Sequence, residues 1–137
     1  MTYEYRCKIL RIVDGDTVDV DIDLGFGIWI HKERVRIVGI DTPESRTKNA
    51  EEKIFGLAAK EYLKFLLPIG SMQIIATQKD KTGKFGRILG DFIVDDTYVS
   101  ILMMESHHAV PYNAENKETL TELHEINRRK LREKGLV

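Results

Sequence analysis

Alternating apolar and polar residues in the first third of the chain predict β-strands. Residues 18–23 alternate valine or isoleucine with aspartate, which predicts a strand with one buried face and one acidic, solvated face. An earlier strand is predicted over 5–12 and ends at a glycine turn at 14–15. Residues 24–31 predict the outer part of a long hairpin, and the strand that follows it is predicted over 33–40, with a β-branched run at 35–40.

The predicted hairpin carries Trp29, the one tryptophan of the chain. At an exposed tip it would stack on a nucleic-acid base or contact a partner, and Ile28 to Ile30 would suit a dimer contact. The alternative is that Trp29 covers the core. We favour this alternative because most large aromatic side chains are packed.

A helix is predicted after the polar loop that follows the third strand. Asn49 and Glu52 have the spacing of an N-terminal capping pair, and Pro68 and Gly70 mark the end of the helix. Apolar residues recur at three-to-four spacing and predict its core face. They are Ile54, Leu57, Ala58, Tyr62, Phe65 and Leu66.

The rest of the chain predicts two strands and two helices. The strands cover 71–77 and 87–94, and a short helix covers 99–106. Thr119 and Glu122 predict a capping box for the last helix. Its inward residues are Leu120, Leu123, Ile126 and Leu131.

This order of elements is typical of an OB-fold. Five strands, with one helix after the third and two helices at the end, predict an α+β protein with a five-stranded OB-fold β-barrel and three α-helices. The length of 137 residues, 42% of them apolar, suits a single domain over 1–137. Cys7 is the one cysteine, which excludes an internal disulfide and a multi-cysteine metal site.

Charge limits the classes of partner. The formal net charge of -1 gives no global attraction to a polyanion, so affinity for nucleic acid would have to come from local clusters. Residues 79–87 hold four cations and one aspartate, a pattern also typical of a solvated loop. No start resembling a signal peptide and no run of roughly 18 apolar residues is present, so we expect a cytoplasmic protein that does not enter a membrane.

Polar residues around the third predicted strand are the best candidates for chemistry. Pro43 cannot continue a strand, so Asp41 and Glu44 leave a rigid strand end together. By the alternation, Asp16 lies on an apolar face, and Arg36 also points where apolar side chains point. Buried charges need partners, so we expect Arg36 to meet a carboxylate or a ligand's phosphate. A turn cap is the simpler alternative for Asp16.

Two further groups of candidates lie in the second half of the chain. Arg87 opens a predicted strand, and a strand-initial arginine is held firmly enough to suit phosphate binding. His107 and His108 invite a metal interpretation, but adjacent side chains point apart and no third soft ligand is near. A structural role is therefore favoured for the two histidines.

Three motifs then occur in a recognisable order. They are Val-Asp-Gly-Asp-Thr-Val at 13–18, Arg36 five residues before Asp-Thr-Pro-Glu at 41–44, and Lys-Phe-Gly-Arg at 84–87. Together they resemble the staphylococcal nuclease (thermonuclease) family of Ca²⁺-dependent DNA and RNA hydrolases, over nearly the whole chain. The long hairpin and Ala-Val-Pro-Tyr at 109–112 are similar to the family's phage and bacterial intracellular members.

The resemblance implies a metal site and a site for water. Asp16 and Asp41 would supply carboxylates to Ca²⁺, and the backbone carbonyl of Thr42 would complete the protein's share of the ligands. Hard oxygen ligands of this kind suit Ca²⁺. Glu44 would correspond to the acid that orients or deprotonates the attacking water.

The resemblance also implies how substrate is held. Arg36 and Arg87 would clamp the scissile phosphate, and Lys84 and Tyr112 would contact the substrate. The family's Asp-Lys-Tyr-Gly-Arg turn appears here as Gly-Lys-Phe-Gly-Arg at 83–87, so an acid and a phenolic hydroxyl are missing. We expect weaker binding of a terminal phosphate with catalysis intact, and more salt-sensitive binding than in the basic type member.

The residues predict a metal-dependent phosphodiesterase, and the resemblance implies an endo- or exonuclease that uses Ca²⁺ to cleave DNA and/or RNA. A pocket at the side of a barrel reaches an unpaired strand more easily than a duplex, so single-stranded substrate is expected. Contacts to phosphate imply little sequence specificity. No protein partner is predicted. The alternative is a non-catalytic OB-fold module that binds nucleic acid or protein, but such a binder has no need for inward carboxylates that repel phosphate.

Overall fold

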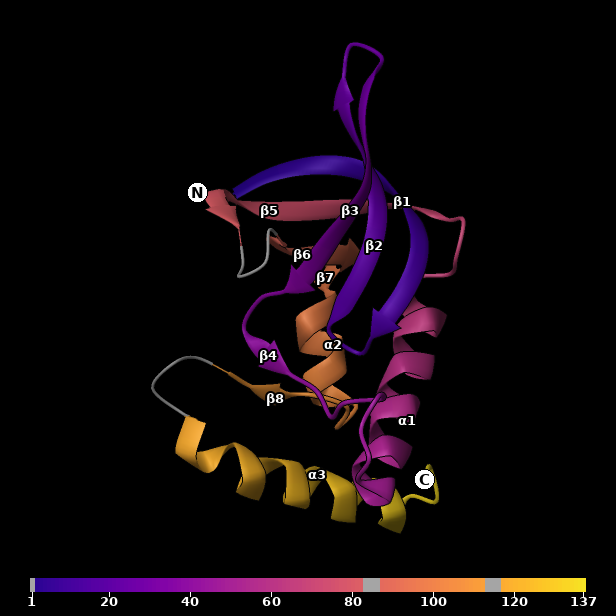
Figure 1. The fold of residues 1–137 in the computed structure, drawn as a ribbon, viewed down its shortest axis with the longest axis vertical. Coiled ribbons are helices and arrows are strands. Elements are labelled where there is room, and N and C mark those ends of the chain that lie inside the picture. Colours follow the sequence, from indigo (N-terminus) through magenta and orange to yellow (C-terminus); the bar gives the residue numbers. More distant parts are fainter. Residues whose placement is uncertain (1, 83–86, 113–116) are drawn as a thin grey trace.

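Within the described residues, five long strands and one two-residue strand form one sheet, and three α-helices lie below and beside it (Figure 1). The structure, a computed structural model, describes residues 2–82, 87–112 and 117–137. The strand order is β3-β2-β1-β5-β6-β7. A further, parallel pairing joins β3 to β6, so the first and the fifth strand of this order are also neighbours. This is the α+β, OB-type architecture that the sequence predicts. The strands are β1 (Thr2–Asp14), β2 (Thr17–Gly25), β3 (Ile28–Ile37), β5 (Met72–Thr82), β6 (Ile88–Val94) and β7 (Thr97–Tyr98).

The first strand is longer than the predicted 5–12 because it has a partner on each side. Residues 2–8 of β1 pair with β5, and residues 6–14 pair with β2. Along β2 the alternation is confirmed, since Val18, Val20 and Ile22 are at most 2% exposed. Burial also raises the pKa of the Cys7 thiol to about 12, so this cysteine is an inert core residue at neutral pH.

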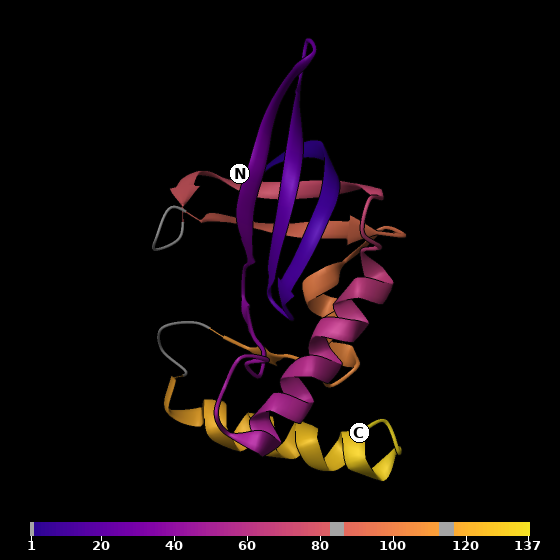
Figure 2. The same cartoon turned by 45° about the vertical axis from the view of Figure 1, so that its right-hand side comes forward.

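The hairpin of β2 and β3 projects beyond the sheet as an arm (Figures 1 and 2). Its turn has positive φ at Gly25, Phe26 and Gly27, and the Phe26 side chain is fully exposed. Trp29 is 37% exposed and outside the core cluster. The prediction that it covers the core is wrong, because Trp29 pairs with Asp23 one step beyond Ile22 and Ile30, which do contact the core.

Helix α1 (Ala50–Leu66) begins where predicted, and the Asn49 side chain accepts a hydrogen bond from the Glu52 amide at 3.0 Å. The predicted core face is wrong in part, because Tyr62 and Leu66 do pack against the core but other members of the set do not. Ile54 and Phe65 are more than half exposed. Apolar residues occur on nearly every side of this helix, and the small residues select the face that packs. The buried residues of α1 are Phe55, Gly56, Ala59 and Leu63.

Helix α2 (Val99–Glu105) packs under β6 and starts at a buried carboxylate. Asp91 accepts hydrogen bonds from the amides of Phe92 and Ser100 and from the Ser100 hydroxyl. Burial raises the pKa of Asp91, and the bonds from Ser100 and Phe92 oppose this shift. The carboxyl group therefore satisfies the start of α2 inside the fold.

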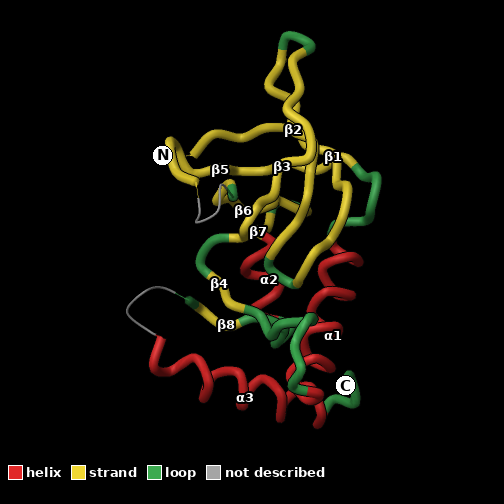
Figure 3. Tube along the Cα trace, viewed as in Figure 1, coloured by secondary structure: helices red, strands yellow, loops and turns green. Residues whose placement is uncertain are grey.

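Helix α3 (Leu120–Glu133) crosses below two short strands, β4 (Ile40–Asp41) and β8 (Val110–Pro111) (Figure 3). A 3-10 turn, Lys117–Thr119, precedes it. The capping-box prediction is wrong, because Thr119 already has helical backbone angles and makes no side-chain capping bond.

The inward face of α3 also differs in part from the prediction. Leu131 is buried, but Ile126 is 38% exposed. None of the helices within the described residues has the length and hydropathy that crossing a membrane requires.

Candidate active site

Asp16 and Arg36 form an ion pair beside the turn that joins β1 to β2. Arg36 Nη2 lies 3.4 Å from Asp16 Oδ2, and the Thr17 hydroxyl donates to Asp16 Oδ1 at 2.9 Å. Both charged side chains are mostly buried, since Arg36 is 17% exposed and Asp16 is 13% exposed. The expectation that each inward charge needs a partner is confirmed, because each is the partner of the other.

Arg36 also holds the backbone that leads to Asp41. Its Nη1 donates to the Ile37 carbonyl at 2.6 Å, and its Nη2 donates to the Ile40 carbonyl at 2.8 Å. Residue 40 is the neighbour of Asp41 in β4. One guanidinium therefore ties Asp16 to the segment that carries Asp41. A guanidinium has five N–H donors, so these bonds leave donors for a further anion.

Asp16 and Asp41 are close enough to influence each other. Burial is the main cause of a raised pKa at Asp16, and the Arg36 charge and the Thr17 hydroxyl oppose it. The negative charges of Asp14 and Asp41 raise the pKa further. A bound cation would relieve this repulsion between carboxylates.

Thr42 lies against the turn that presents Asp16. A Cβ on Gly15 would stand 3.1 Å from Thr42 Oγ1 and 2.9 Å from the Ala59 Cβ. Thr42 is 5% exposed, and its Oγ1 is buried without a hydrogen-bond partner in the described part of the chain. Pairing of Asp41 with Val110 fixes the backbone just before it.

Glu44 is positioned by α1 and by Asp14. The Glu44 amide donates to Glu52 Oε2 at 3.1 Å. The Glu52 carboxylate therefore binds the loop before α1 at Glu44, and not at the N-cap residue Asn49. The amide and hydroxyl of Ser45 donate to Asp14 Oδ1 at 3.1 and 2.6 Å. Gly56 lies under the backbone of residues 44 and 45, where no Cβ would fit. The Glu44 side chain itself is exposed and free to meet solvent.

Two other predicted site residues, Arg87 and Tyr112, lie next to strands β6 and β4. Arg87 immediately precedes β6, in which Leu89 pairs with Arg36, so its backbone lies two residues from that pairing. The Tyr112 amide donates to the Gly39 carbonyl at 2.9 Å, beside β4. Lys84 lies outside the described residues.

Of the two histidines that follow α2, His108 has the structural role that the sequence favoured. The His108 ring is buried and stacks on Tyr62 at a centroid distance of 5.0 Å. Burial lowers the pKa of His108. The ring therefore packs as a neutral aromatic group.

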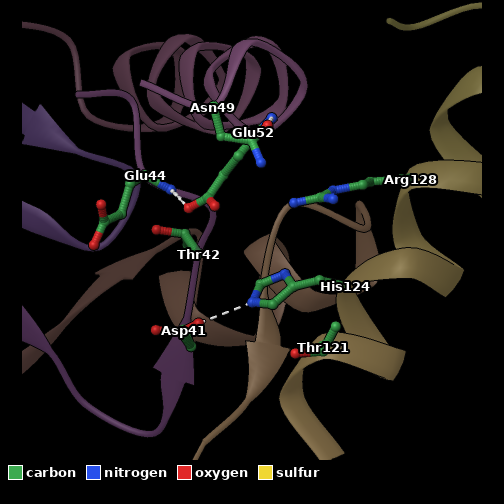
Figure 4. Close-up of a pocket in the computed structure, with 8 residues that line it drawn as sticks. All are labelled: Asp41, Thr42, Glu44, Asn49, Glu52, Thr121, His124 and Arg128. Atoms are coloured by element: carbon green, nitrogen blue, oxygen red, sulfur yellow. Dashed lines mark hydrogen bonds and ion pairs between the residues drawn. The ribbon is translucent and has the colours of Figure 1, made fainter. Parts of the chain in front are cut away.

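A cavity of about 320 Å³ opens between the 41–44 segment and α3 (Figure 4). His124 Nε2 lies 2.8 Å from Asp41 Oδ2 across it. The sequence pattern did not single out His124, although it lies four residues after Leu120 and seven before Leu131 and so shares their face. The lining residues are Asp41, Thr42, Glu44, Asn49, Glu52, Thr121, His124 and Arg128.

Helix α3 is held in place beyond His124 by an aromatic and an acid of α1. The guanidinium carbons of Arg128 and Arg132 lie 5.4 and 5.1 Å from the centre of the Phe55 ring. Their terminal nitrogens lie 3.7 and 3.4 Å from Glu51 Oε1. The Asn127 amide group donates to the Ala109 carbonyl at 3.0 Å. These contacts fix the helix that carries His124.

The residues at this site fit a hard divalent cation. Asp16 and Asp41 repel each other electrostatically, and Thr42 is packed against the turn before Asp16. Two carboxylates and a backbone carbonyl are the oxygen donors that Ca²⁺ prefers, with water completing the shell. Within 2–82, 87–112 and 117–137, no three His, Cys, Asp or Glu side chains are grouped to hold a metal by themselves. A cation held here would therefore need a carbonyl and water in addition to the two carboxylates.

Comparison with known proteins relates these residues to a family. The family described as Staphylococcal nuclease homologue matches residues 34–135. Over 81 residues the chain is 33% identical to a thermonuclease from Staphylococcus intermedius, which covers 59% of this chain and 44% of that protein. Over 95 residues it is 32% identical to endonuclease YncB from Bacillus subtilis (strain 168), which covers 69% and 42%.

A third relative is named differently. Protein ParB from Escherichia coli is 36% identical over 87 residues, which are 64% of this chain and 41% of that protein. The chain thus spans less than half the length of each of these three relatives.

Proposed function

Because this chain belongs to the staphylococcal nuclease homologue family, we propose that it is a Ca²⁺-dependent nuclease that hydrolyses phosphodiester bonds of DNA and/or RNA. The observation that carries the proposal is that Arg36 contacts both Asp16 and the backbone next to Asp41. A carboxylate and a guanidinium thus lie close to the segment that carries Asp41, which supports a site for a cation and a phosphate. Relatives named as a thermonuclease and an endonuclease support the same activity.

In this proposal Asp16, Asp41 and the Thr42 carbonyl hold Ca²⁺. When bound, Ca²⁺ supplies positive charge that stabilises the charge growing on the phosphate in the transition state. Arg36 adds a fixed guanidinium beside these ligands. It is already held by two carbonyls and needs little reorganisation when a phosphate arrives.

Glu44 orients or deprotonates the attacking water. Its backbone is anchored from two sides, by Glu52 and through the next residue by Asp14, while its carboxylate reaches solvent. Such a fixed backbone with an accessible acid suits a group that must place water within about 3 Å of its target.

The remaining assignments concern the substrate. Arg87 is proposed as the second phosphate clamp, and Lys84 and Tyr112 as substrate contacts. Contacts limited to phosphate give little sequence specificity. The side chains of Arg36 and Asp16 are mostly buried, and an unpaired strand reaches such groups more readily than a duplex does, so single-stranded DNA or RNA is the expected substrate.

The test is a nuclease assay on matched single- and double-stranded DNA and RNA with Ca²⁺, Mg²⁺ or chelator. We expect Ca²⁺-dependent cleavage that Glu44→Gln and Arg36→Ala each lower by about 10²-fold or more. Matched controls are Glu61→Gln, an exposed acid of α1, and Arg34→Ala, an exposed arginine of β3. Both should cleave normally.

Free energies of unfolding measured in parallel separate lost chemistry from lost folding. Normal cleavage by folded Glu44→Gln and Arg36→Ala proteins would refute the assignment. Binding of nucleic acid by the unmodified protein without cleavage in any metal would favour the non-catalytic module instead.

A further inference from the structure

His124 contacts the proposed metal site from a helix that supplies none of its ligands. The ring is largely buried, at 13% exposed, and its Nε2 lies 2.8 Å from Asp41 Oδ2. An ionised carboxylate only accepts hydrogen bonds, so Nε2 must carry the proton and donate it to Asp41. The two residues are 83 positions apart in the sequence, so the contact exists only when α3 is docked.

The bond uses one oxygen of Asp41 and leaves the other facing away. Figure 4 shows the second carboxylate oxygen of Asp41 on the side opposite His124. The backbone at residue 41 is fixed by pairing with Val110, and the bond to His124 fixes the side-chain rotamer. The carboxylate is thereby oriented before any cation arrives.

We propose that His124 is a positioning residue of the cation site, through which docked α3 sets the affinity for Ca²⁺. The proposal rests on the proposed function, because it takes Asp41 as a ligand. Partners that hydrogen-bond to metal ligands typically contribute 10- to 100-fold to metal affinity by holding the ligand in its binding orientation. His124 itself contacts neither substrate nor cation in this scheme.

The anchoring of α3 supports this role. Four residues beyond His124, Arg128 lies over the Phe55 ring, and Arg132 lies over the same ring one turn later. Leu131 is buried, at 2% exposed. A histidine on a helix held this firmly can restrain Asp41, whereas a histidine on a mobile surface segment would not.

The test is calorimetric titration of the full chain with Ca²⁺, without nucleic acid. We expect His124→Ala to raise the Ca²⁺ dissociation constant about tenfold. His124→Gln should restore most of the affinity, because the glutamine amide nitrogen reaches the position of imidazole Nε2. His124→Asn should not, because its shorter side chain corresponds to Nδ1. The matched control is His31→Ala, since His31 also contacts an aspartate but lies on the arm.

Cleavage rates at saturating Ca²⁺ complete the test. A positioning role through the metal predicts near-normal rates for all His124 variants once Ca²⁺ is saturating, with the loss confined to the Ca²⁺ concentration required. Free energies of unfolding without Ca²⁺ show whether each variant is folded.

Two results would overturn the proposal. One is an unchanged Ca²⁺ dissociation constant in folded His124→Ala. The other is a lower Ca²⁺ dissociation constant in that variant, which would mean that the imidazole competes with the cation. If the unmodified protein neither binds Ca²⁺ nor cleaves nucleic acid, the proposed function fails as well. If it does both while His124→Ala binds Ca²⁺ equally well, only the positioning role fails.

Discussion

Replacing Gly56 with alanine should damage the site through the backbone of Glu44. Gly56 is in the middle of α1 and buried against residues 44 and 45. A Cβ at position 56 would overlap the Glu44 carbonyl and stand 2.6 Å from the Ser45 amide nitrogen, where real Cβ atoms essentially never come within 3.0 Å. The obstacle is backbone, so no flexible side chain can move aside to admit the methyl group.

The magnitude follows from two opposing effects. In an open helix, Gly→Ala would stabilise by about 1 kcal/mol, because alanine has the higher helix propensity. Overpacking of a close backbone contact costs about 1–3 kcal/mol. The net change in the free energy of unfolding is therefore a loss of between about 0 and 2 kcal/mol. The loop must also shift by roughly 1 Å, and a misplacement of that size can lower kcat about 10²-fold.

The assay pairs urea unfolding with cleavage of single-stranded DNA at saturating Ca²⁺. We expect Gly56→Ala to remain folded while kcat falls by about two orders of magnitude. Leu57→Ala is the control, because Leu57 is the next residue, is 43% exposed and should alter neither measurement strongly. A Gly56→Ala protein that is more stable and cleaves normally would refute this account of how α1 places Glu44.

Two further changes test packing away from the chemistry. Because the pKa of Asp91 is raised in the fold, the native state binds the Asp91 proton more tightly than the unfolded chain does. As the pH rises above 3.8, the free energy of unfolding of the unmodified protein should therefore fall relative to that of Asp91→Asn. Urea unfolding of both proteins without Ca²⁺, from roughly pH 3.5 upward, measures this difference in the free energy of unfolding. A difference that stays constant with pH would contradict the prediction. Phe55→Leu keeps an apolar side chain but removes the ring under Arg128 and Arg132, so it should cost about 1–2 kcal/mol. A loss below about 0.5 kcal/mol in urea unfolding would show that the ring face contributes little.

The sheet and half of the site could be predicted from the sequence because their pattern is local. Alternation along β2 specifies which residues face inward, and the same alternation places Asp16 on that face. The face of Arg36 follows from its own strand. A buried guanidinium must find an acceptor, so a carboxylate or a ligand's phosphate was the expected partner of Arg36, and the structure shows that the carboxylate is Asp16.

The packing of the helices could be predicted only in part, because it is decided by partners distant in the sequence. On α1, apolar side chains such as Ile54 and Phe65 fit the helical period but are exposed. Gly56 and Ala59 face inward because only small residues allow the helix to approach the 44–45 backbone and the turn at Gly15. A count of hydrophobic spacing cannot detect selection by size.

The segment from Asp41 to Glu44 depends on contacts from opposite sides. The sheet side contributes Arg36 at the Ile40 carbonyl, and the helical side contributes Glu52 at the Glu44 amide and His124 at Asp41. The one regular pairing of this segment in the described structure is the two-residue ladder of β4 with β8. Loosening α1 or α3 should therefore displace the acids at a smaller energetic cost than unfolding the sheet, so activity should be lost before the fold is.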